Sequence, residues 1–250
     1  MPHDPFHSDR WVRGLVGNTT VVECRGQLLV WEPELPVPRY LFPTGSVEKG
    51  VLVEVEPPAR LGYHHPNSPV STWFDIVVGD QTLRHAAWIR TEFPDHVGVT
   101  WQADHLDWFE EARQVFEHPH DPYVHIDAYP STRHVTISIE GVGLADTSDA
   151  VFLWETGLPT RLYVPRDDVD LTALTPTDTQ SVCPYKGFAT DYWSTTDVRD
   201  VAWSYPDPFF PYRNIADRIA FLSERVDVTI DGVLQPRPVP KTWAARERLD

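Results

Sequence analysis

Two stretches of the chain, one in each half, share the same order of residues. "GQLLVWEPELPVPRYLFPTGSVEKGVL" spans 26–52, and "DAVFLWETGLPTRLYVPRDDVDLTAL" spans 149–174. Trp31-Glu32 align with Trp154-Glu155, and four further pairs then match at one constant offset: Arg39 with Arg161, Pro43 with Pro165, Val47 with Val169, and Leu52 with Leu174. Self-similarity of this kind indicates a repeated structural unit, here of about one hundred residues, which is the size of a domain.

The duplication predicts where the domains begin and end. A first, degenerate copy is expected over 1–118, and a second copy over 135–238. The segment 119–134 is rich in Pro, His and Asp, which is typical of an ordered linker. The tail, 239–250, is polar after its last proline and is expected to form a surface strap or a partly disordered end.

Local patterns favour a mainly β fold in both copies, with few short helices. The chain holds 24 prolines, whose spacing suits short strands and firm loops better than long helices. "HVTISIEGVGLADT" (134–147) alternates apolar and polar residues around a Gly pair and predicts a hairpin, and Asp231-Gly232 predicts another. One segment differs: Leu106, Phe109, Arg113 and Phe116 keep helical spacing in 103–116, with Asp104 as a possible cap.

Charge and cysteine content narrow the range of partners and locations. The formal net charge of −16 disfavours nucleic acid or an anionic membrane as the main partner, because both need clustered Lys and Arg. We find no apolar run of membrane-spanning length and no apolar signal core at the N-terminus. Two cysteines far apart do not form a disulfide framework, so a reduced, cytoplasmic protein is expected. The oligomeric state stays open.

The stretch "CPYKG" (183–187) is the strongest candidate for a functional site. An ammonium near a thiol favours the nucleophilic thiolate, and Lys186 follows Cys183 by three residues. Tyr185 is placed to close such a pocket, and Gly187 allows a positive φ. The alternative is a structural β-turn with a buried cysteine. The first copy has "NSPVSTWFDIVV" (67–78) in this place, without Cys, Lys or Gly, which favours function in the second copy.

A carboxylate and several aromatic residues complete the predicted site. Glu155 ends an apolar run and is expected to be half-buried, either in an ion pair or clamp with Arg161 or as a general base beside Lys186. Aromatic side chains are individually more typical of the core, but together they form possible walls of a ligand pocket. The predicted catalytic set is Cys183, Lys186 and Glu155, and the predicted ligand-binding set is Tyr163, Tyr185, Tyr192, Trp193, Trp203 and Arg161.

The histidines are weaker candidates for a functional site, here a metal site, than the CPYKG stretch. His118, His120 and His125 lie close together, with Asp121 or Asp127 as further possible ligands, but the proline-broken segment favours solvated loop histidines. His64-His65 are interpreted in the same way. Cys24 aligns with Thr147 and is expected to be a small buried strand residue. No glycine-rich phosphate loop, GxSxG, HExxH or CxxC pattern is present, so no metal is assigned and the cofactor stays unknown.

Several motifs of the second copy together resemble a bacterial and fungal family known as domain of unknown function 427, sometimes labelled nucleotidyltransferase-like. They are "GVGLADT" (141–147), "ETGLPTRLYVPRDDV" (155–169), "CPYKGFA" (183–189), Tyr192-Trp193 and "AWSYPDP" (202–208). The sequence departs from the family at Thr190-Asp191, where two residues instead of one precede the tyrosine. The resemblance implies a compact, tent- or barrel-like β fold and carries no activity. The first copy resembles a second, degenerate member of the same family.

Two classes of function follow from these observations. The first is an enzyme or enzyme-like protein that acts on a small molecule at Cys183, Tyr185 and Lys186, with the first copy as a scaffold. The second is a non-catalytic module that binds a metabolite or a peptide, with Lys186 recognising charge. Whether the protein is an enzyme is left open by the sequence.

Overall fold

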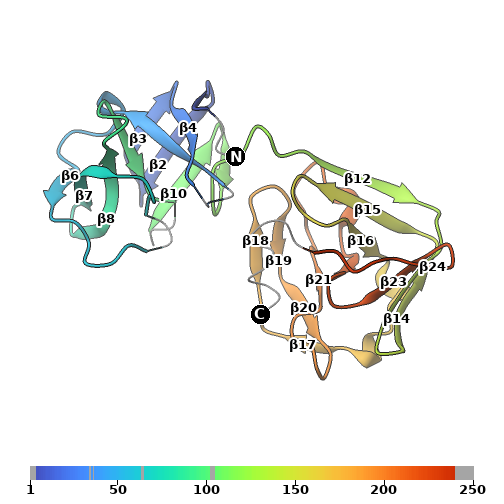
Figure 1. The fold of residues 1–250 in the computed structure, drawn as a ribbon. Helices are drawn as coiled ribbons and strands as arrows, with labels where there is room; N and C mark the ends of the chain where they lie inside the picture. The colour runs from blue at the N-terminus through green and yellow to red at the C-terminus, as the bar shows by residue number, and fades with distance from the viewer. Residues whose placement is uncertain (1–3, 34, 36, 63–64, 102–104, 240–250) are drawn as a thin grey trace. The chain divides into compact units, whose positions relative to one another are not determined.

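The computed structural model describes residues 4–33, 35, 37–62, 65–101 and 105–239 (Figure 1). The chain forms two compact units, Met1–Asp121 and Pro122–Asp250, called the first and second unit below. In the described ranges all paired strands are antiparallel, and the helical elements are short 3-10 turns: η1 (Thr44–Ser46), η2 (Arg166–Asp168), η3 (Leu171–Ala173) and η4 (Arg213–Ile215). The predicted mainly β fold is confirmed.

The first unit consists of a seven-stranded and a four-stranded sheet. The larger sheet has the order β1-β4-β5-β9-β8-β7-β6. Its strands are β1 (Phe6–His7), β4 (Leu28–Trp31), β5 (Pro38–Pro43), β9 (His96–Val99), β8 (Gln81–Arg90), β7 (Val70–Val78) and β6 (Leu52–Val55). The smaller sheet has the order β11-β10-β2-β3, from strands β11 (Arg113–Val115), β10 (Leu106–Glu110), β2 (Trp11–Val16) and β3 (Thr19–Arg25).

The second unit repeats this arrangement and adds one hairpin. Its seven-stranded sheet has the order β12-β15-β16-β22-β21-β20-β17. The strands are β12 (Ile126–Ser131), β15 (Ala150–Glu155), β16 (Arg161–Val164), β22 (Ile219–Phe221), β21 (Ala202–Ser204), β20 (Asp191–Ser194) and β17 (Thr175–Thr177). The four-stranded sheet, β14-β13-β23-β24, contains β14 (Val142–Thr147), β13 (Val135–Ile139), β23 (Asp227–Ile230) and β24 (Val233–Leu234). The added hairpin joins β18 (Ser181–Cys183) to β19 (Gly187–Ala189).

The two units have the same strand order, counted from the first strand of each and with the added β18–β19 hairpin left out of the count. The two units also share two features outside the paired strands, a 3-10 turn and an isolated bridge. Pro43 and Pro165 each precede a 3-10 turn, and isolated bridges join Val22 to Val47 and Ala145 to Val169. Val47 and Val169 are one of the residue pairs that align in the sequence. This agreement supports the internal duplication, which stays a prediction because shared topology can also arise without common ancestry.

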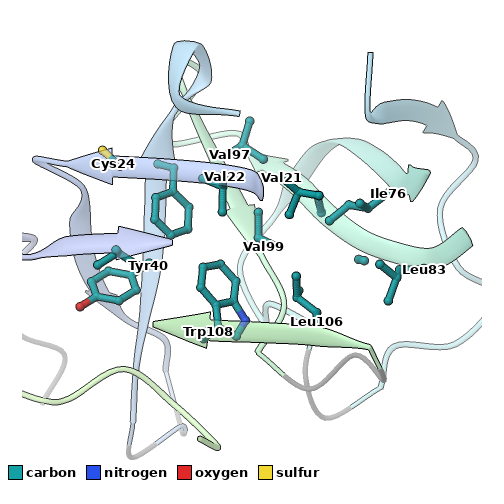
Figure 2. Packing of buried hydrophobic residues seen from close by; sticks show 14 of the residues in the cluster. Val21, Val22, Cys24, Tyr40, Ile76, Leu83, Val97, Val99, Leu106 and Trp108 are labelled. Atoms are coloured by element: carbon teal, nitrogen blue, oxygen red, sulfur yellow. The ribbon is translucent and has the colours of Figure 1, made fainter. Parts of the chain in front are cut away.

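In each unit the two sheets pack face to face around a hydrophobic core. In the first unit, Figure 2 shows Val22 of β3 and Trp108 of β10 directed toward Tyr40 and Val99 of the larger sheet. The exposure of β2 alternates with a period of two, as expected of a strand with one face on the core. Cys24 is a buried free thiol in this cluster, which confirms the prediction for it.

The predicted helix over 103–116 is wrong. Leu106–Glu110 forms β10, which pairs with β2, and Arg113–Val115 forms β11. The helical spacing was misleading because the same segment also alternates: Leu106, Trp108 and Glu110 are buried, whereas Asp107 is exposed. Pairing with β2 decides between the two periods, since it satisfies the backbone and buries Trp108. Asp104, the proposed cap, lies outside the described residues.

Other boundaries agree with the sequence in part. Both predicted hairpins are confirmed, β13–β14 and β23–β24, the latter turning at Asp231-Gly232. The segment expected to be a linker contains β12, which pairs along β15, so Ile126–Ser131 belongs to the second unit's sheet. The tail from 240 onward lies outside the described residues. Among the helical elements that the structure describes, none is long and apolar enough to cross a membrane.

Candidate functional site

The seven-stranded sheet of the second unit buries residues on both faces. Its inner face packs against the four-stranded sheet. The opposite face, called here the outer face, carries a separate buried cluster: Val151, Leu153, Tyr163, Ala189, Tyr205, Ile215 and Ala220. Ala189 comes from the β18–β19 hairpin and Ile215 from η4, so these two segments cover the outer face. The "CPYKG" stretch therefore lies over this cluster.

The β18–β19 hairpin turns through Pro184, Tyr185 and Lys186. Cys183 pairs with Gly187 across the turn. Gly187 has φ +101°, a conformation that favours glycine, and an added Cβ would lie 3.3 Å from the ring of Phe209. Phe209 also donates its backbone N–H to the carbonyl of Lys186 at 2.8 Å. The turn is thus held from outside by the segment that follows β21.

Lys186 points inward from this turn and forms a buried ion pair with Glu155. Nζ lies 2.5 Å from Oε2, Lys186 is 6% exposed, and the Glu155 side chain is 12% exposed. Glu155 ends β15 on the same side as Val151 and Leu153, because side chains two apart on a strand share a face. Burial acts to lower the pKa of Lys186, but the charges of Cys183 and Glu155 outweigh it and raise that pKa well above 10.5. Lys186 therefore remains an ammonium.

Cys183 and two tyrosines surround this ammonium. Cys183 is a half-buried free thiol that packs against the outer-face cluster, and it is the strongest of the charge influences on Lys186. Burial raises the pKa of Tyr163 to about 12. Burial and the neighbouring Tyr163 raise the pKa of Tyr205 well above 10.0, and the two ring centroids lie 6.5 Å apart. At neutral pH Lys186 thus carries its ammonium and both tyrosines keep their phenol protons.

The expected pairing of Glu155 with Arg161 is wrong. Arg161 donates from Nη1 and Nη2 to the two carboxylate oxygens of Glu224, at 2.5 and 2.8 Å, and from Nη1 to Ser223 Oγ at 2.7 Å. Its guanidinium also lies over the ring of Trp203, 5.6 Å from the centroid. A planar guanidinium binds a carboxylate through two parallel bonds, and Glu224 lies within reach for that geometry. Glu155 is left to Lys186.

The Arg161–Glu224 pair predicts how acid affects the second unit. Burial acts to raise the pKa of Glu224, but the hydrogen bonds and charge of Arg161 hold it below the ordinary 4.5. A lowered folded-state pKa gives stability that is full above about pH 4.5 and is lost as pH falls through the folded-state value. We expect the stability difference between wild type and Arg161→Met to shrink between about pH 5 and pH 3. Urea denaturation across this range measures it, and a difference independent of pH contradicts the assignment.

The predicted aromatic residues divide between the two faces of the sheet. Tyr163, Tyr192 and Trp203 lie on the outer face, where Tyr192 bonds Ser181 Oγ at 2.6 Å through its hydroxyl. Trp193 is buried in the core between the sheets, because neighbours along a strand point to opposite faces. Tyr185 is half-buried in the hairpin turn. The structure thus brings Cys183, Lys186 and Glu155 together with Tyr163, whereas the guanidinium of Arg161 contacts Glu224 and Trp203.

The first unit holds another buried ion pair at the equivalent position. Glu32 follows β4 as Glu155 ends β15, and its Oε1 lies 3.1 Å from Arg90 Nη1, while Ser68 Oγ donates to Oε2 at 2.5 Å. Here the cation comes from β8. Between β6 and β7, the described residues form no counterpart of the β18–β19 hairpin. The carboxylate position therefore recurs without a thiol or an amine beside it.

Two histidines, His65 and His120, differ from their expected solvated state. His120 is mostly buried, with Nδ1 2.9 Å from Glu110 Oε2, and His65 lies against the rings of Trp73 and Trp88. His64 lies outside the described residues. His125 is exposed beside Asp127 and agrees with the expectation. Within the described ranges no three His, Cys, Asp or Glu side chains are grouped to hold a metal ion.

Three residues of the site were not assigned by the sequence. Tyr205, Glu224 and Phe209 belong to neither of the two predicted sets. Glu224 carried a usable signal: it is a charged residue three positions after a strand whose three residues are all buried. Phe209 carried none, because its contact with Gly187 depends on how two distant segments meet.

Residues 127–232 match the family model described as Domain of unknown function (DUF427). The match covers most of the second unit, including the β18–β19 hairpin, and ends before β24. No curated protein matches the chain.

Proposed function

We propose that the second unit acts on a small molecule at Cys183, beside the ammonium of Lys186. One observation supports this most: Cys183, Lys186, Glu155, Tyr163 and Tyr205 converge on one face of one sheet, around a buried ion pair. Buried charges are costly unless paired, and clusters of interacting ionisable groups occur preferentially at functional sites. Cys183 is half-buried, whereas Lys186, Tyr163 and Tyr205 are buried.

The geometry assigns different roles to the three predicted catalytic residues. Lys186 keeps its proton, so it supplies positive charge and hydrogen bonds rather than a nucleophilic amine. Glu155 is bonded to Lys186 at 2.5 Å and acts as a positioning residue rather than as the general base. Cys183 is left as the nucleophile, because an adjacent ammonium favours the thiolate.

A non-catalytic binding module is the second candidate. It is favoured by the tight pairing of Lys186 with Glu155, which leaves both charges neutralised before any ligand arrives. In that case the same groups would bind a metabolite or a peptide through hydrogen bonds, without reaction at sulfur.

Three further expectations belong to this proposal. The first unit is taken as a second, decayed copy of the same family, supported by its strand order. It would act as a scaffold, since its equivalent face has Arg90 and Ser68 around Glu32 and lacks a thiol there. The cytoplasmic location expected from the two cysteines stays a prediction.

Alkylation of Cys183 tests the proposal. In a Cys24→Ala background Cys183 is the only cysteine. Glu155→Gln keeps the ammonium, and Glu155→Gln with Lys186→Met removes it from the same neutral background. We expect iodoacetamide to react with Cys183 about tenfold faster in the first variant near pH 7, since the thiolate is the reacting form of a cysteine and an adjacent ammonium favours it. The rate constants are measured by mass spectrometry on protein with an intact melting transition.

Equal rates in the two variants would remove the nucleophile and leave the binding module. Lys186→Arg, which retains the positive charge, is the matched control and should stay close to wild type.

A further inference from the structure

The β18–β19 hairpin belongs to neither of the two main sheets of the second unit (Figure 1). Residues 178–190 lie between β17 and β20, which pair with each other, so the hairpin is an excursion from that edge of the seven-stranded sheet. Its two strands pair with each other and form a separate two-stranded sheet. A segment outside the main ladders can open at a free energy below that of global unfolding.

The hairpin strands bury little apolar surface against the outer face. The buried residues of β19 are Gly187 and Ala189, the two smallest residue types, whereas Phe188 between them is 44% exposed. Each residue of β18 is half-buried or exposed. Hydrophobic stabilisation follows the apolar area removed from water, so these strands lose little of it when they leave the outer face.

Polar contacts also hold the hairpin on the outer face. Lys186 forms the buried ion pair with Glu155, and its carbonyl accepts the N–H of Phe209 at 2.8 Å. At the open end of the hairpin, Ser181 Oγ lies 2.6 Å from the hydroxyl of Tyr192. Two buried charges that separate into water regain their hydration, which offsets much of the attraction that is lost. The ion pair therefore closes the hairpin without making its opening prohibitively costly.

We propose that the β18–β19 hairpin is a lid, which opens from the outer face while the two main sheets of the second unit stay folded. Lys186, Tyr163 and Tyr205 are 6%, 1% and 5% exposed when the hairpin is closed. In its purpose the lid rests on the function proposed above, because a small molecule meets these three side chains only after the hairpin lifts. Opening and closing of a covering segment would then control access to the site.

Hydrogen exchange of the Phe209 amide, followed by NMR in the full chain, measures the opening. This N–H is bonded to the carbonyl of Lys186 and is freed when the hairpin lifts. We expect it to exchange about tenfold faster than the amides of β16 and β22, with a weaker dependence on urea, because opening exposes less surface than unfolding.

Gly187→Ala should favour the open lid. Gly187 has φ +101°, and an added Cβ would lie 3.3 Å from the ring of Phe209. We expect exchange of the Phe209 amide to rise about tenfold further in this variant, while the amides of β16 and β22 keep their rates. Gly232→Ala is the matched control, because Gly232 has φ +79° but an added Cβ there meets no atom within 4 Å. It should leave the Phe209 amide unchanged.

The inference is overturned if the Phe209 amide exchanges with the rate and urea dependence of β16 and β22, or if Gly187→Ala accelerates all of them equally. Exchange without any protection also overturns it, because the hairpin would then never be closed. The alkylation rates described above test the function separately. If the lid opens but alkylation does not depend on Lys186, the lid stands and the proposed function fails. If alkylation depends on Lys186 but the Phe209 amide exchanges with the sheets, the function stands and the lid fails.

Discussion

Replacing Lys186 with methionine is expected to lower the free energy of unfolding of the second unit by about 3–5 kcal/mol. The variant leaves Glu155 without its ammonium beneath the β18–β19 hairpin, where 12% of its side chain is exposed. Removing one partner of a buried ion pair is costly, because the remaining charge keeps its desolvation penalty without the compensating attraction. Hydrogen exchange of amides in β15 and β16 reports this unit separately from the first.

The double variant, Glu155→Gln with Lys186→Met, separates the charge from the packing. It removes both charges while keeping side chains of similar size, so most of the lost stability should return. If the double variant is as unstable as Lys186→Met, the hairpin depends on the shape of the lysine chain, and the unpaired carboxylate is not the cause. If Lys186→Met is as stable as wild type, Glu155 is better solvated than its contacts indicate.

This expectation affects how the chemistry must be tested. Lys186→Met alone would expose Cys183 by unfolding, and faster alkylation would then have no mechanistic meaning. Glu155→Gln in turn leaves the buried ammonium without its carboxylate, so the alkylation rates are compared only under conditions in which hydrogen exchange shows the second unit of both variants to be folded. The Lys186–Glu155 ion pair thus has two proposed roles. It holds the β18–β19 hairpin on the outer face, and its ammonium supplies the positive charge beside the thiol.

The fold class and two of the hairpins were accessible from the sequence because they depend on local patterns. Alternation over 134–147 gave the β13–β14 hairpin, and Asp231-Gly232 gave the next. The helix predicted over 103–116 failed for a physical reason. Leu106, Trp108 and Glu110 satisfy a period of two as well as Leu106, Phe109 and Arg113 satisfy a helical one, and only pairing with β2 selects the strand.

The sequence named several residues that the structure brings together, but it did not show which charged residues form ion pairs with each other. Cys183 and Lys186 are close in sequence, and Glu155 was placed at the end of an apolar run. The partner of Arg161 was beyond the sequence, because Glu224 is 63 positions away and reaches it through the β16–β22 ladder. The sequence could not show that Trp193 lies in the core between the sheets, because a one-residue change of register decides which face of a sheet an aromatic side chain occupies.

Gly98→Ala is expected to destabilise the first unit by about 3 kcal/mol. Gly98 pairs with Trp88 across β8 and β9, and an added Cβ would lie 2.3 Å from Trp88 Nε1, far inside contact distance. Trp88 is 1% exposed and packs against Trp73, with ring centroids 5.9 Å apart, so the indole has no free space to enter. Either the ring leaves its rotamer or the strands separate.

Gly45→Ala is the matched control in the same unit, since an added Cβ there meets no atom within 4 Å. Its effect should stay within about 0.5 kcal/mol. Hydrogen exchange of amides in β8 and β9 compares the two variants. Equal stabilities would mean that Trp88 moves aside at little cost. The second unit has Ala220 at the equivalent place, beside Trp203. A large effect of Gly98→Ala would therefore show that Trp88 leaves less room at Gly98 than Trp203 leaves at Ala220, although the two larger sheets share their strand order.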